Sequence, residues 1–331
     1  MGLETVIIGA GLAGMTCARA LQAAGHPVVL LDKSRGVGGR LATRRLHGTH
    51  ADHGFRVWAP EHPELQKLTH ELVAAGVLQP WGEGYAAKDG GNAIAKYLAR
   101  NLKIHRQHRV VRLDAVGQHW QIASEVANTT TLQRMSADQV VLALPAPQTV
   151  DLLAASGFSD AATEPLRQVT YAPCVTVMAG YKTPLAGWPD QPWMVPPGDS
   201  PIQSLILDSR KRQQPSPAVV VIHSTGEFAT GTLSTDRNQL EPIAHQLIQA
   251  ATTLVPALVQ PDWMQVHRWR YAFVTRPHSA SWVTLPRSVT SASAARSILC
   301  CGDWCQLKPY QNLDAAYASG QATALQICNL L

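Results

Sequence analysis

The stretch GAGLAG, Gly9–Gly14, decides the fold of this 331-residue chain. It follows a short β-branched run, Thr5 to Ile8, and precedes MTCARALQAAG, which predicts a helix closed by Gly25. PVVLLD then predicts a second buried strand that ends at Asp32. Strand, glycine turn, helix and strand fill about thirty residues, the size of one βαβ unit. In this setting the pattern GxGxxG strongly indicates a dinucleotide site, rather than a glycine-rich turn without a ligand.

Each glycine of this turn has a separate expected role. Gly9 permits the tight turn, Gly11 lets the backbone approach a pyrophosphate, and Gly14 lets helix and strand pack closely. The first helical turn, which includes Leu12 and Ala13, should offer its N–H groups and partial positive charge to the phosphates.

Asp32 lies at the end of the second strand, eighteen residues beyond Gly14. A carboxylate there should accept hydrogen bonds from the adenosine ribose and repel a 2′-phosphate, which argues against NADP. It does not distinguish NAD from FAD. The alternative is a helix-capping or solvated acid.

The following stretch, DKSRGVGGR, spans Asp32 to Arg40 and contains three glycines and three bases. Its glycines would let the chain fold back close to a cofactor, and its arginines could contact phosphate or ribose oxygens. A plain NAD domain does not need such a second loop, so the stretch favours FAD; the alternative is an exposed basic loop. The residues expected to contact the cofactor here are Lys33, Arg35, Gly39, Arg40 and Leu41.

Composition excludes several classes of protein. The chain is 46% hydrophobic and 15% charged, which is typical of a folded protein, and its net charge of +5 is too small and too dispersed for nucleic-acid binding. Six cysteines without paired CxxC motifs predict reduced thiols and no metal site. No apolar run suggests a signal peptide or a membrane span, so we expect a cytoplasmic protein. HExxH and paired catalytic carboxylates are absent, which argues against metalloprotease and glycosidase chemistry.

From about residue 150 to 290, proline and tryptophan become frequent and strand patterns dominate. We expect an α/β fold: a Rossmann-type, doubly wound FAD/NAD(P)-binding domain with an inserted, mostly antiparallel, sheet-rich substrate domain. The expected cofactor domain comprises residues 1–60, 85–150 and 290–331, and the substrate domain residues 61–84 and 151–289. In the second region, strands are expected at 169–181, 202–207, 218–223 and 263–269, with a helix at 237–254.

The stretch RGVGGRLAT resembles the RxGGRxxS/T motif of the flavin amine oxidase and phytoene desaturase superfamily, with one extra residue before the glycine pair. The longer form DKSRGVGGR is similar to renalases and renalase-like bacterial flavoproteins. Further landmarks follow along nearly the whole chain: ADHGFRVW, GGNAIAKYLA, HRWRYA and CGDW…LDAAYASGQATA. His53 and Phe55 depart from the usual pattern of the first of these, and Arg56 and Trp58 follow, so the substrate pocket is expected to differ.

The resemblance implies a noncovalent FAD. It places Gly302 and Asp303 at the ribityl and pyrophosphate, and the start of the last helix, with Leu313 and Ala316, at the flavin pyrimidine. A turn or helix-cap role is the alternative for Asp303. Val110 would make a backbone contact to adenine, or else is a plain strand residue. Cys305 is the cysteine nearest to a covalent-flavin context, and we expect no bond.

When a flavin oxidises a C–H bond, the protein must hold the donor carbon over the flavin ring and exclude water. It does not need to supply a base if the substrate carries a lone pair. The densest candidate cluster is HRWRY, 267–271, in which alternation would place His267, Trp269 and Tyr271 on one face as an aromatic wall. An ordinary core strand is the alternative. Other candidates are Asn312, Lys308, Tyr310 and Gln311 before the last helix and, more weakly, Trp193, His223 and Trp282.

The expected function is an FAD-dependent oxidoreductase that takes a hydride from a reduced nitrogen-containing small molecule and passes electrons to O₂, releasing H₂O₂. The resemblance implies dihydronicotinamide isomers of NAD(P) as substrates. An amine oxidase and a quinone-linked dehydrogenase or desaturase remain alternatives, as does a non-catalytic flavin-binding redox sensor. No nucleic-acid or membrane partner is expected.

Overall fold

The structure is a computed structural model that describes residues 4–129, 131–212, 217–285, 296–306 and 312–330. Its first part is built on a six-stranded sheet in the order β17-β18-β11-β1-β2-β7. All neighbouring pairs are parallel except β17 with β18. The strands are β1 (Thr5–Ile8), β2 (Val28–Asp32), β7 (Lys103–Arg106), β11 (Gln139–Leu142), β17 (Val283–Leu285) and β18 (Ile298–Cys300).

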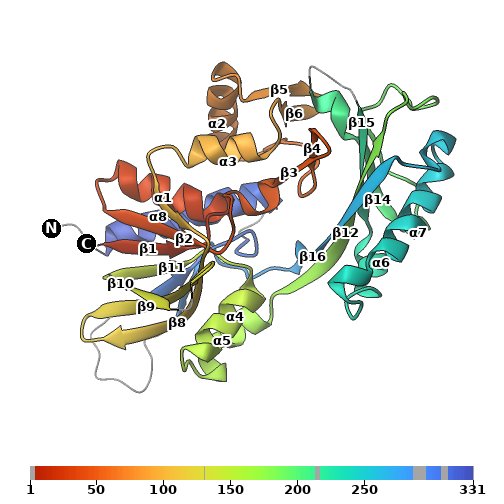
Figure 1. The fold of residues 1–331 in the computed structure, drawn as a ribbon. Coiled ribbons are helices and arrows are strands. Elements are labelled where there is room, and N and C mark those ends of the chain that lie inside the picture. Colours follow the sequence, from red (N-terminus) through yellow and green to blue (C-terminus); the bar gives the residue numbers. More distant parts are fainter. Residues whose placement is uncertain (1–3, 130, 213–216, 286–295, 307–311, 331) are drawn as a thin grey trace.

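Both faces of this sheet are covered, which explains why its central strands are continuous apolar runs. On one face lie α1 (Leu12–Ala23) and α8 (Asn312–Asn329), whose buried residues share one core (Figure 1). The two helices approach closely at Gly320, where a Cβ would lie 2.4 Å from the Ala13 carbonyl oxygen.

A second core covers the opposite face. It involves an antiparallel sheet of three strands, in the order β10-β9-β8, together with two helices. These elements are β8 (His108–Val116), β9 (His119–Val126), β10 (Leu132–Ala137), α4 (Ala146–Ala155) and α5 (Asp160–Arg167).

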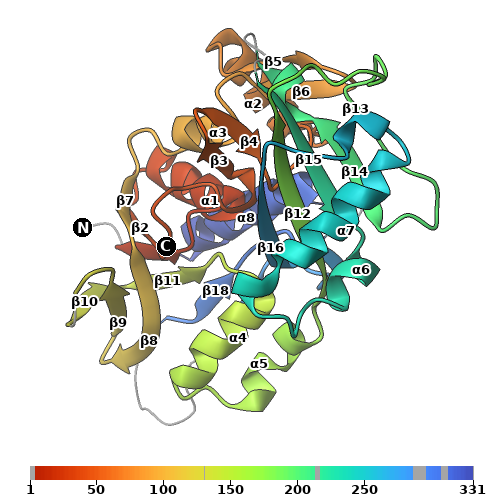
Figure 2. The ribbon, with the colours of Figure 1, turned by 45° about the vertical axis from the view of Figure 1, so that its right-hand side comes forward.

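The second part is an antiparallel five-stranded sheet in the order β13-β14-β15-β12-β16. Helices α6 and α7 cover its outer face, and its inner face is turned toward the first part (Figures 1 and 2). The elements are β12 (Thr170–Tyr181), β13 (Trp193–Met194), β14 (Ile202–Leu207), β15 (Ala218–Ser224), β16 (Trp263–Arg276), α6 (Gly226–Thr230) and α7 (Glu241–Thr252).

Two hairpins and two helices connect the parts. Apolar residues of both hairpins, including Ala51, Trp81 and Ala86, pack against the inner face of the five-stranded sheet. The elements are β3 (Thr43–Leu46), β4 (Thr49–Asp52), β5 (Leu78–Trp81), β6 (Gly84–Ala87), α2 (Pro63–Ala74) and α3 (Asn92–Leu98). Short 3₁₀ helices are η1 (Gly39–Leu41), η2 (Asp208–Lys211), η3 (Arg237–Gln239) and η4 (Pro256–Leu258).

This architecture confirms the expected fold class, with differences in detail. The helix expected from residue 237 begins at Glu241, because Pro242 suits a first helical turn and the preceding residues form η3. The strand expected at 263–269 continues to Arg276. Helices α4 and α5 were not expected; Pro147 lies in the first turn of α4, where proline is well tolerated.

The domain boundaries stay predictions. Leu65, Leu68 and Leu72 of α2 pack into the core of α1 and α8, and β17 extends the six-stranded sheet. No helix within the described ranges has the length and apolar character needed to cross a membrane.

Candidate functional site

The first glycine loop connects β1 to α1 and is crowded at two positions. Gly9 has φ +110°, and a Cβ on it would lie 2.4 Å from the Ala143 carbonyl oxygen. A Cβ on Gly14 would lie 2.0 Å from the Gly9 carbonyl oxygen. A Cβ on Gly11, in contrast, would have no atom within 4 Å, and Gly11 caps α1 without a side-chain hydrogen bond. The loop therefore leaves open space at the start of α1, as a phosphate-bearing cofactor requires.

Asp32 fixes the position of this loop relative to the end of β2. Its Oδ2 accepts a hydrogen bond from the Ala10 backbone at 2.7 Å, and its Oδ1 accepts one from the Ser34 backbone at 2.7 Å. A carboxylate oxygen can accept a second hydrogen bond, so the contacts leave capacity for a ribose hydroxyl.

The second glycine loop lies directly against the first. Gly38 donates its N–H to the Ala10 carbonyl at 2.8 Å and forms an isolated parallel bridge with Gly11. Gly38 and Gly39 have φ values of +111° and +55°, which a side chain would rarely adopt. A Cβ on Gly39 would lie 3.6 Å from Gly11 Cα, so the two loops share one surface.

Arg40 joins this second loop to Gly302 and Asp303, the GD motif near the other end of the chain. Its Nη1 donates to Asp303 Oδ2 at 2.6 Å, its Nη2 donates to Asp303 Oδ1 at 2.7 Å, and Nη1 also donates to the Ala272 carbonyl at 3.0 Å. Burial lowers the pKa of Arg40 and the Asp303 carboxylate raises it, with a net upward shift. The pairing explains how the Asp303 carboxylate, 4% exposed, can be buried beside the glycine loops.

Gly302 is held to α8 by a hydrogen bond from its N–H to Ser319 Oγ at 3.1 Å. Leu313 and Ala316, in the first turns of α8, pack into the core shared with α1. Asn312 begins α8 with φ +51°. The candidate residues Lys308, Tyr310 and Gln311 lie outside the described residues.

Three of the residues expected to contact the cofactor, Lys33, Arg35 and Val110, interact with segments other than the Arg40–Asp303 pair. Lys33 is exposed and donates to the Gln148 side chain at 3.2 Å. Arg35 is exposed, and its carbonyl accepts a hydrogen bond from Arg106. Val110 is half-buried in β8, where the register with β9 is irregular.

The expected aromatic wall is split into two clusters. His267 and Trp269 contact each other with ring centroids 4.4 Å apart, and both rings lie against His53, at 5.1 and 5.2 Å. Trp269 Nε1 also donates to the His53 carbonyl at 2.9 Å. Tyr271 instead packs against Tyr171, with ring centroids 5.5 Å apart. A register irregularity between Trp269 and Phe273 interrupts the simple alternation on which the expectation depended.

His267 also ends a polar row that crosses four strands of the five-stranded sheet. In register from β14 to β16, the row consists of Ser204, His223, Thr176 and His267. His223 Nδ1 lies 3.1 Å from Ser204 Oγ. The next inward-facing level contains Met178, Ile206 and Val221, which belong to an apolar cluster. The row is therefore the polar end of an otherwise apolar face.

Four charged side chains, of which Asp52, Asp208 and Lys211 are buried and Arg212 half-buried, attach this face to the β3–β4 hairpin. Lys211 Nζ lies 2.9 Å from Asp208 Oδ1 and 3.4 Å from Asp52 Oδ2, and Arg212 Nη1 lies 2.6 Å from Asp208 Oδ2. Asp52 Oδ1 also accepts from Thr43 Oγ1 at 2.6 Å and from the Gly91 N–H at 2.8 Å. Burial raises the pKa of Asp52, while Lys211 and Arg212 lower it, with a net downward shift. The cluster fixes the backbone just before His53.

Two histidines at this site are held neutral. Burial, then His267 and Arg44, lower the pKa of His53 to about 3. Burial, then Lys211, lower the pKa of His223 to about 4. Among the described residues His53 Nδ1 is buried without a hydrogen-bond partner, whereas the His223 ring interacts with the His53 backbone, which partly offsets the lowering of its pKa.

The weaker candidates Trp193 and Trp282 have packing roles. Trp193 lies against Trp81, with ring centroids 5.0 Å apart, and under the Arg56 guanidinium. Trp282 packs against the core of α1 and α8.

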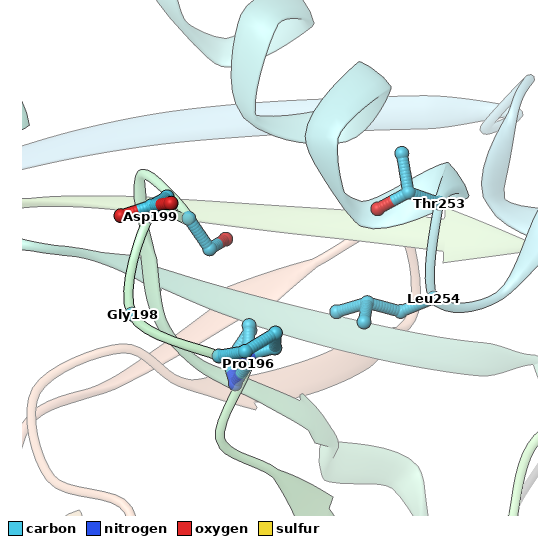
Figure 3. A pocket seen from close by; sticks show the side chains of 7 residues that line it. Pro196, Gly198, Asp199, Thr253 and Leu254 are labelled. Carbon is cyan, nitrogen blue, oxygen red and sulfur yellow. The ribbon is translucent and has the colours of Figure 1, made fainter.

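Two surface hollows lie outside the glycine loops. One of about 240 Å³ lies between the β13–β14 connection and the end of α7, and is lined by Pro196, Asp199 and Leu254 among others (Figure 3). Another of about 420 Å³ lies between α2 and β6. Among the described residues, no three His, Cys, Asp or Glu side chains group as a metal site.

The sequence prediction omitted Thr176, Ser204, Lys211, Asp52, Asp208 and Arg212. These residues meet because of strand register and because of contacts between residues far apart in the sequence. Asp52 and Lys211, for example, are 159 residues apart. One acid, one lysine and two arginines in DSRKR, 208–212, are equally typical of an exposed charged loop.

The comparisons with known proteins agree with this architecture. The model of the family "Flavin containing amine oxidoreductase" matches residues 74–328, and that of "NAD(P)-binding Rossmann-like domain" matches residues 7–72. The renalase of Mus musculus is 26% identical over 302 residues, which cover 82% of this chain and 85% of that protein.

Two further similarities concern putrescine oxidases. The enzyme of Kocuria rosea is 37% identical over 90 residues, which cover 26% of this chain and 19% of that protein. A solved structure of a putrescine oxidase double mutant has a TM-score of 0.71 at 13% identity, covering 99% of this chain and 100% of that one. These findings confirm the resemblance inferred from the RGVGGR loop and support a flavin cofactor. The chain belongs to the flavin containing amine oxidoreductase family and is a flavin-dependent oxidoreductase.

Proposed function

We propose that the protein binds FAD noncovalently and oxidises a reduced nitrogen-containing small molecule, with a dihydronicotinamide isomer of NAD(P) as the substrate class. The similarity to a renalase along most of both chains supports the comparison with that branch of the family. The substrate loses a hydride, and O₂ takes up this hydride and one proton to become H₂O₂. When bound, the flavin supplies the hydride-accepting centre and the route for electrons to O₂.

The observation that carries the proposal is the convergence of two glycine loops and the GD motif. Gly11 leaves open space at the start of α1, Gly38 and Gly39 lie against it, and Arg40 pairs with Asp303 beside both. A single loop suffices for a simple dinucleotide, whereas the second loop suits a longer ligand that continues toward the five-stranded sheet.

The chain's own residues have distinct proposed roles around this ligand. The N–H groups at the start of α1 and the Arg40 guanidinium bind the pyrophosphate region, and Asp32 binds the adenosine ribose. His53, His267 and Trp269 line the substrate side, where their rings orient the donor and exclude water. Buried Cys305, whose pKa burial raises, has little thiolate to form a covalent flavin link.

An amine oxidase is the second candidate, favoured by the family itself and by the putrescine oxidase similarities. A quinone-linked dehydrogenase and a non-catalytic redox sensor are further outcomes of the same experiment. The purified protein, loaded with FAD, is mixed without oxygen with amines, with NAD(P)H and with its dihydronicotinamide isomers. Loss of flavin absorbance with the isomers, followed by recovery and H₂O₂ on adding O₂, supports the proposal.

Reduction by an amine alone would instead assign an amine oxidase. Reduction by an isomer with no recovery in O₂, but recovery with a quinone, would assign the dehydrogenase. A flavin that no compound reduces would favour the sensor.

A further inference from the structure

Six exposed cations gather at one side of the proposed cofactor site. Two lie in the loop after β2, two lie in or just after α3, and two belong to β7, at the edge of the six-stranded sheet. We call them the basic surface; its members are Lys33, Arg35, Lys96, Arg100, Lys103 and Arg106. The sequence disperses these residues over more than seventy positions, and the fold brings them together.

Direct contacts hold the three elements of the basic surface against one another. Strand β7 pairs with β2 so that Arg106 lies in register with Asp32, and Arg106 Nη1 donates to the Arg35 carbonyl at 3.2 Å. Helix α3 packs on the same loop, because a Cβ on Gly38 would lie 2.6 Å from Ala95 Cβ, and α3 leads directly into β7 (Figure 2). The basic surface therefore surrounds the end of the site at which Asp32 is assigned to the adenosine ribose.

The charges of the basic surface are not paired with acids. Within the described part of the chain, none of its six side chains forms an ion pair with a carboxylate. Arg100 lies 4.4 Å from the centre of the Tyr97 ring, and Lys33 donates to the Gln148 amide, so both keep their charge. Because the whole chain has a net charge of only +5, most of its positive excess is concentrated at this one place.

A surface of this kind acts on a ligand before contact is made. Exposed charges of one sign raise the local concentration of an oppositely charged ligand and accelerate its association, and dissolved salt screens the effect. FAD is dianionic through its pyrophosphate. Lys96, Arg100 and Lys103 belong to neither glycine loop, so contacts with a bound pyrophosphate do not explain why they gather here.

We propose that the basic surface steers FAD into its site. It attracts the dianionic cofactor from solution and accelerates its binding, while the glycine loops and Arg40 hold the cofactor once it is bound. This inference rests on the proposed function, because it takes FAD as the ligand. It adds a role in cofactor capture for α3 and β7, which lie outside the motifs that define the site.

The test separates association from dissociation. FAD is mixed rapidly with the full-length apoprotein, and the change in flavin fluorescence is followed at salt concentrations from about 0.01 M to about 0.5 M, over which the screening length falls from about 30 Å to a few ångströms. The association rate of the unaltered protein should fall at least about ten-fold across this range.

The triple variant Lys96→Gln, Arg100→Gln, Lys103→Gln should bind FAD at least about three-fold more slowly at low salt and should match the unaltered protein at high salt. Its dissociation rate should stay within about two-fold of the original, because these side chains are not assigned to the bound cofactor. Lys96→Arg, Lys103→Arg keeps both charges and should behave as the unaltered protein does.

The matched control removes the same charge elsewhere. Lys67→Gln, Arg134→Gln, Lys182→Gln alters exposed cations on α2, on β10 and directly after β12. This control should keep the association rate and its salt dependence. Equal slowing in both triple variants would show that net charge matters and location does not, which would overturn the proposal. Faster FAD release with unchanged association in the α3–β7 variant would identify a contact surface and would overturn it as well.

The outcome is separable from that of the proposed function. Salt-dependent association that the α3–β7 variant weakens, in a protein whose flavin no dihydronicotinamide reduces, would refute the function and keep the steering. Flavin reduction by a dihydronicotinamide, in a protein whose FAD association is insensitive to salt, would refute the steering and keep the function.

Discussion

Arg40 and Asp303 are 263 residues apart in the chain and form a two-pronged ion pair, with nitrogen–oxygen distances of 2.6 and 2.7 Å. The pair joins the second glycine loop to the GD motif. A further hydrogen bond, from Arg40 to the Ala272 carbonyl, connects both segments to β16. One guanidinium thus connects three segments that surround the proposed pyrophosphate position. Such planar, paired contacts require arginine, because lysine has no comparable fork.

Replacement of Arg40 should affect both cofactor retention and stability. Arg40→Ala leaves Asp303 buried and unpaired and removes a cation from the phosphate region, so we expect weaker FAD retention. The free energy of unfolding should fall by about 2 kcal/mol, below the range for fully buried pairs because Arg40 is 36% exposed. The flavin-to-protein ratio after gel filtration and a urea melt measure the two effects.

The double variant Arg40→Ala, Asp303→Asn is the control for the unpaired negative charge that Arg40→Ala leaves on Asp303. It should recover part of the stability without recovering FAD retention. Full flavin occupancy in Arg40→Ala would show that the second loop has been misassigned.

Gly11 and Gly14 should respond differently to the same substitution. Gly14→Ala places a Cβ 2.0 Å from a backbone oxygen, so it should destabilise the apoprotein by about 3 kcal/mol or more. Gly11→Ala meets no protein atom and has an ordinary φ of −79°, so the apoprotein should change by less than about 1 kcal/mol. FAD affinity should nevertheless fall in Gly11→Ala, because the added methyl occupies the space proposed for phosphate. Apoprotein melts and FAD titrations test this contrast, which a ligand-free turn would not produce.

The buried charge cluster should be sensitive to the loss of its lysine. Lys211→Met leaves Asp52 and Asp208 with Arg212 as their sole remaining cation within the four-residue cluster, and we expect a loss of about 3–5 kcal/mol in unfolding free energy. Lys67→Met is the matched control: Lys67 pairs with Glu64 on the exposed side of α2, so its loss should leave the free energy of unfolding almost unchanged. Similar urea midpoints for the two variants would contradict the structural role assigned to Lys211.

The depressed pKa of His223 predicts a pH dependence of stability. Its folded pKa of about 4 lies below the unfolded value near 6.5, so the unfolded state binds more protons between these values. This group therefore has no effect above about pH 7, and it destabilises the fold as the pH falls, by about 2 kcal/mol at about pH 5.

Urea unfolding of the apoprotein at pH values between about 7 and 5 measures this slope. The slope should be smaller in His223→Gln, which does not titrate. Parallel curves for the two proteins would mean that His223 is protonated as easily in the folded chain as in the unfolded one.

The cofactor half of the fold could be predicted because its signals are local. Gly9, Gly11, Gly14 and Asp32 act within one βαβ unit, and their spacing alone defines the turn. Apolar, strand-forming runs also located β12, β14 and β15 with small errors. Boundaries were less accurate at α7, which begins at Glu241 after η3 and not at residue 237.

The substrate side could not be predicted in the same way. The row from Ser204 to His267 depends on the register of four strands, which their separate sequences do not specify. The bulge in β16 separated Tyr271 from His267, although strict alternation would place them together. Lys211 can be buried because it pairs with Asp208, three residues earlier, and with Asp52 of a distant segment, and the sequence does not reveal the second contact.

The central claim is a noncovalently held FAD in the space between the two glycine loops. Its most direct test is to denature the purified protein, remove the precipitate and identify the chromophore that stays in solution. The account predicts FAD, at about one molecule per chain after reconstitution with excess cofactor. Absence of flavin after reconstitution, release of FMN alone, or flavin that stays attached to the denatured chain would contradict it.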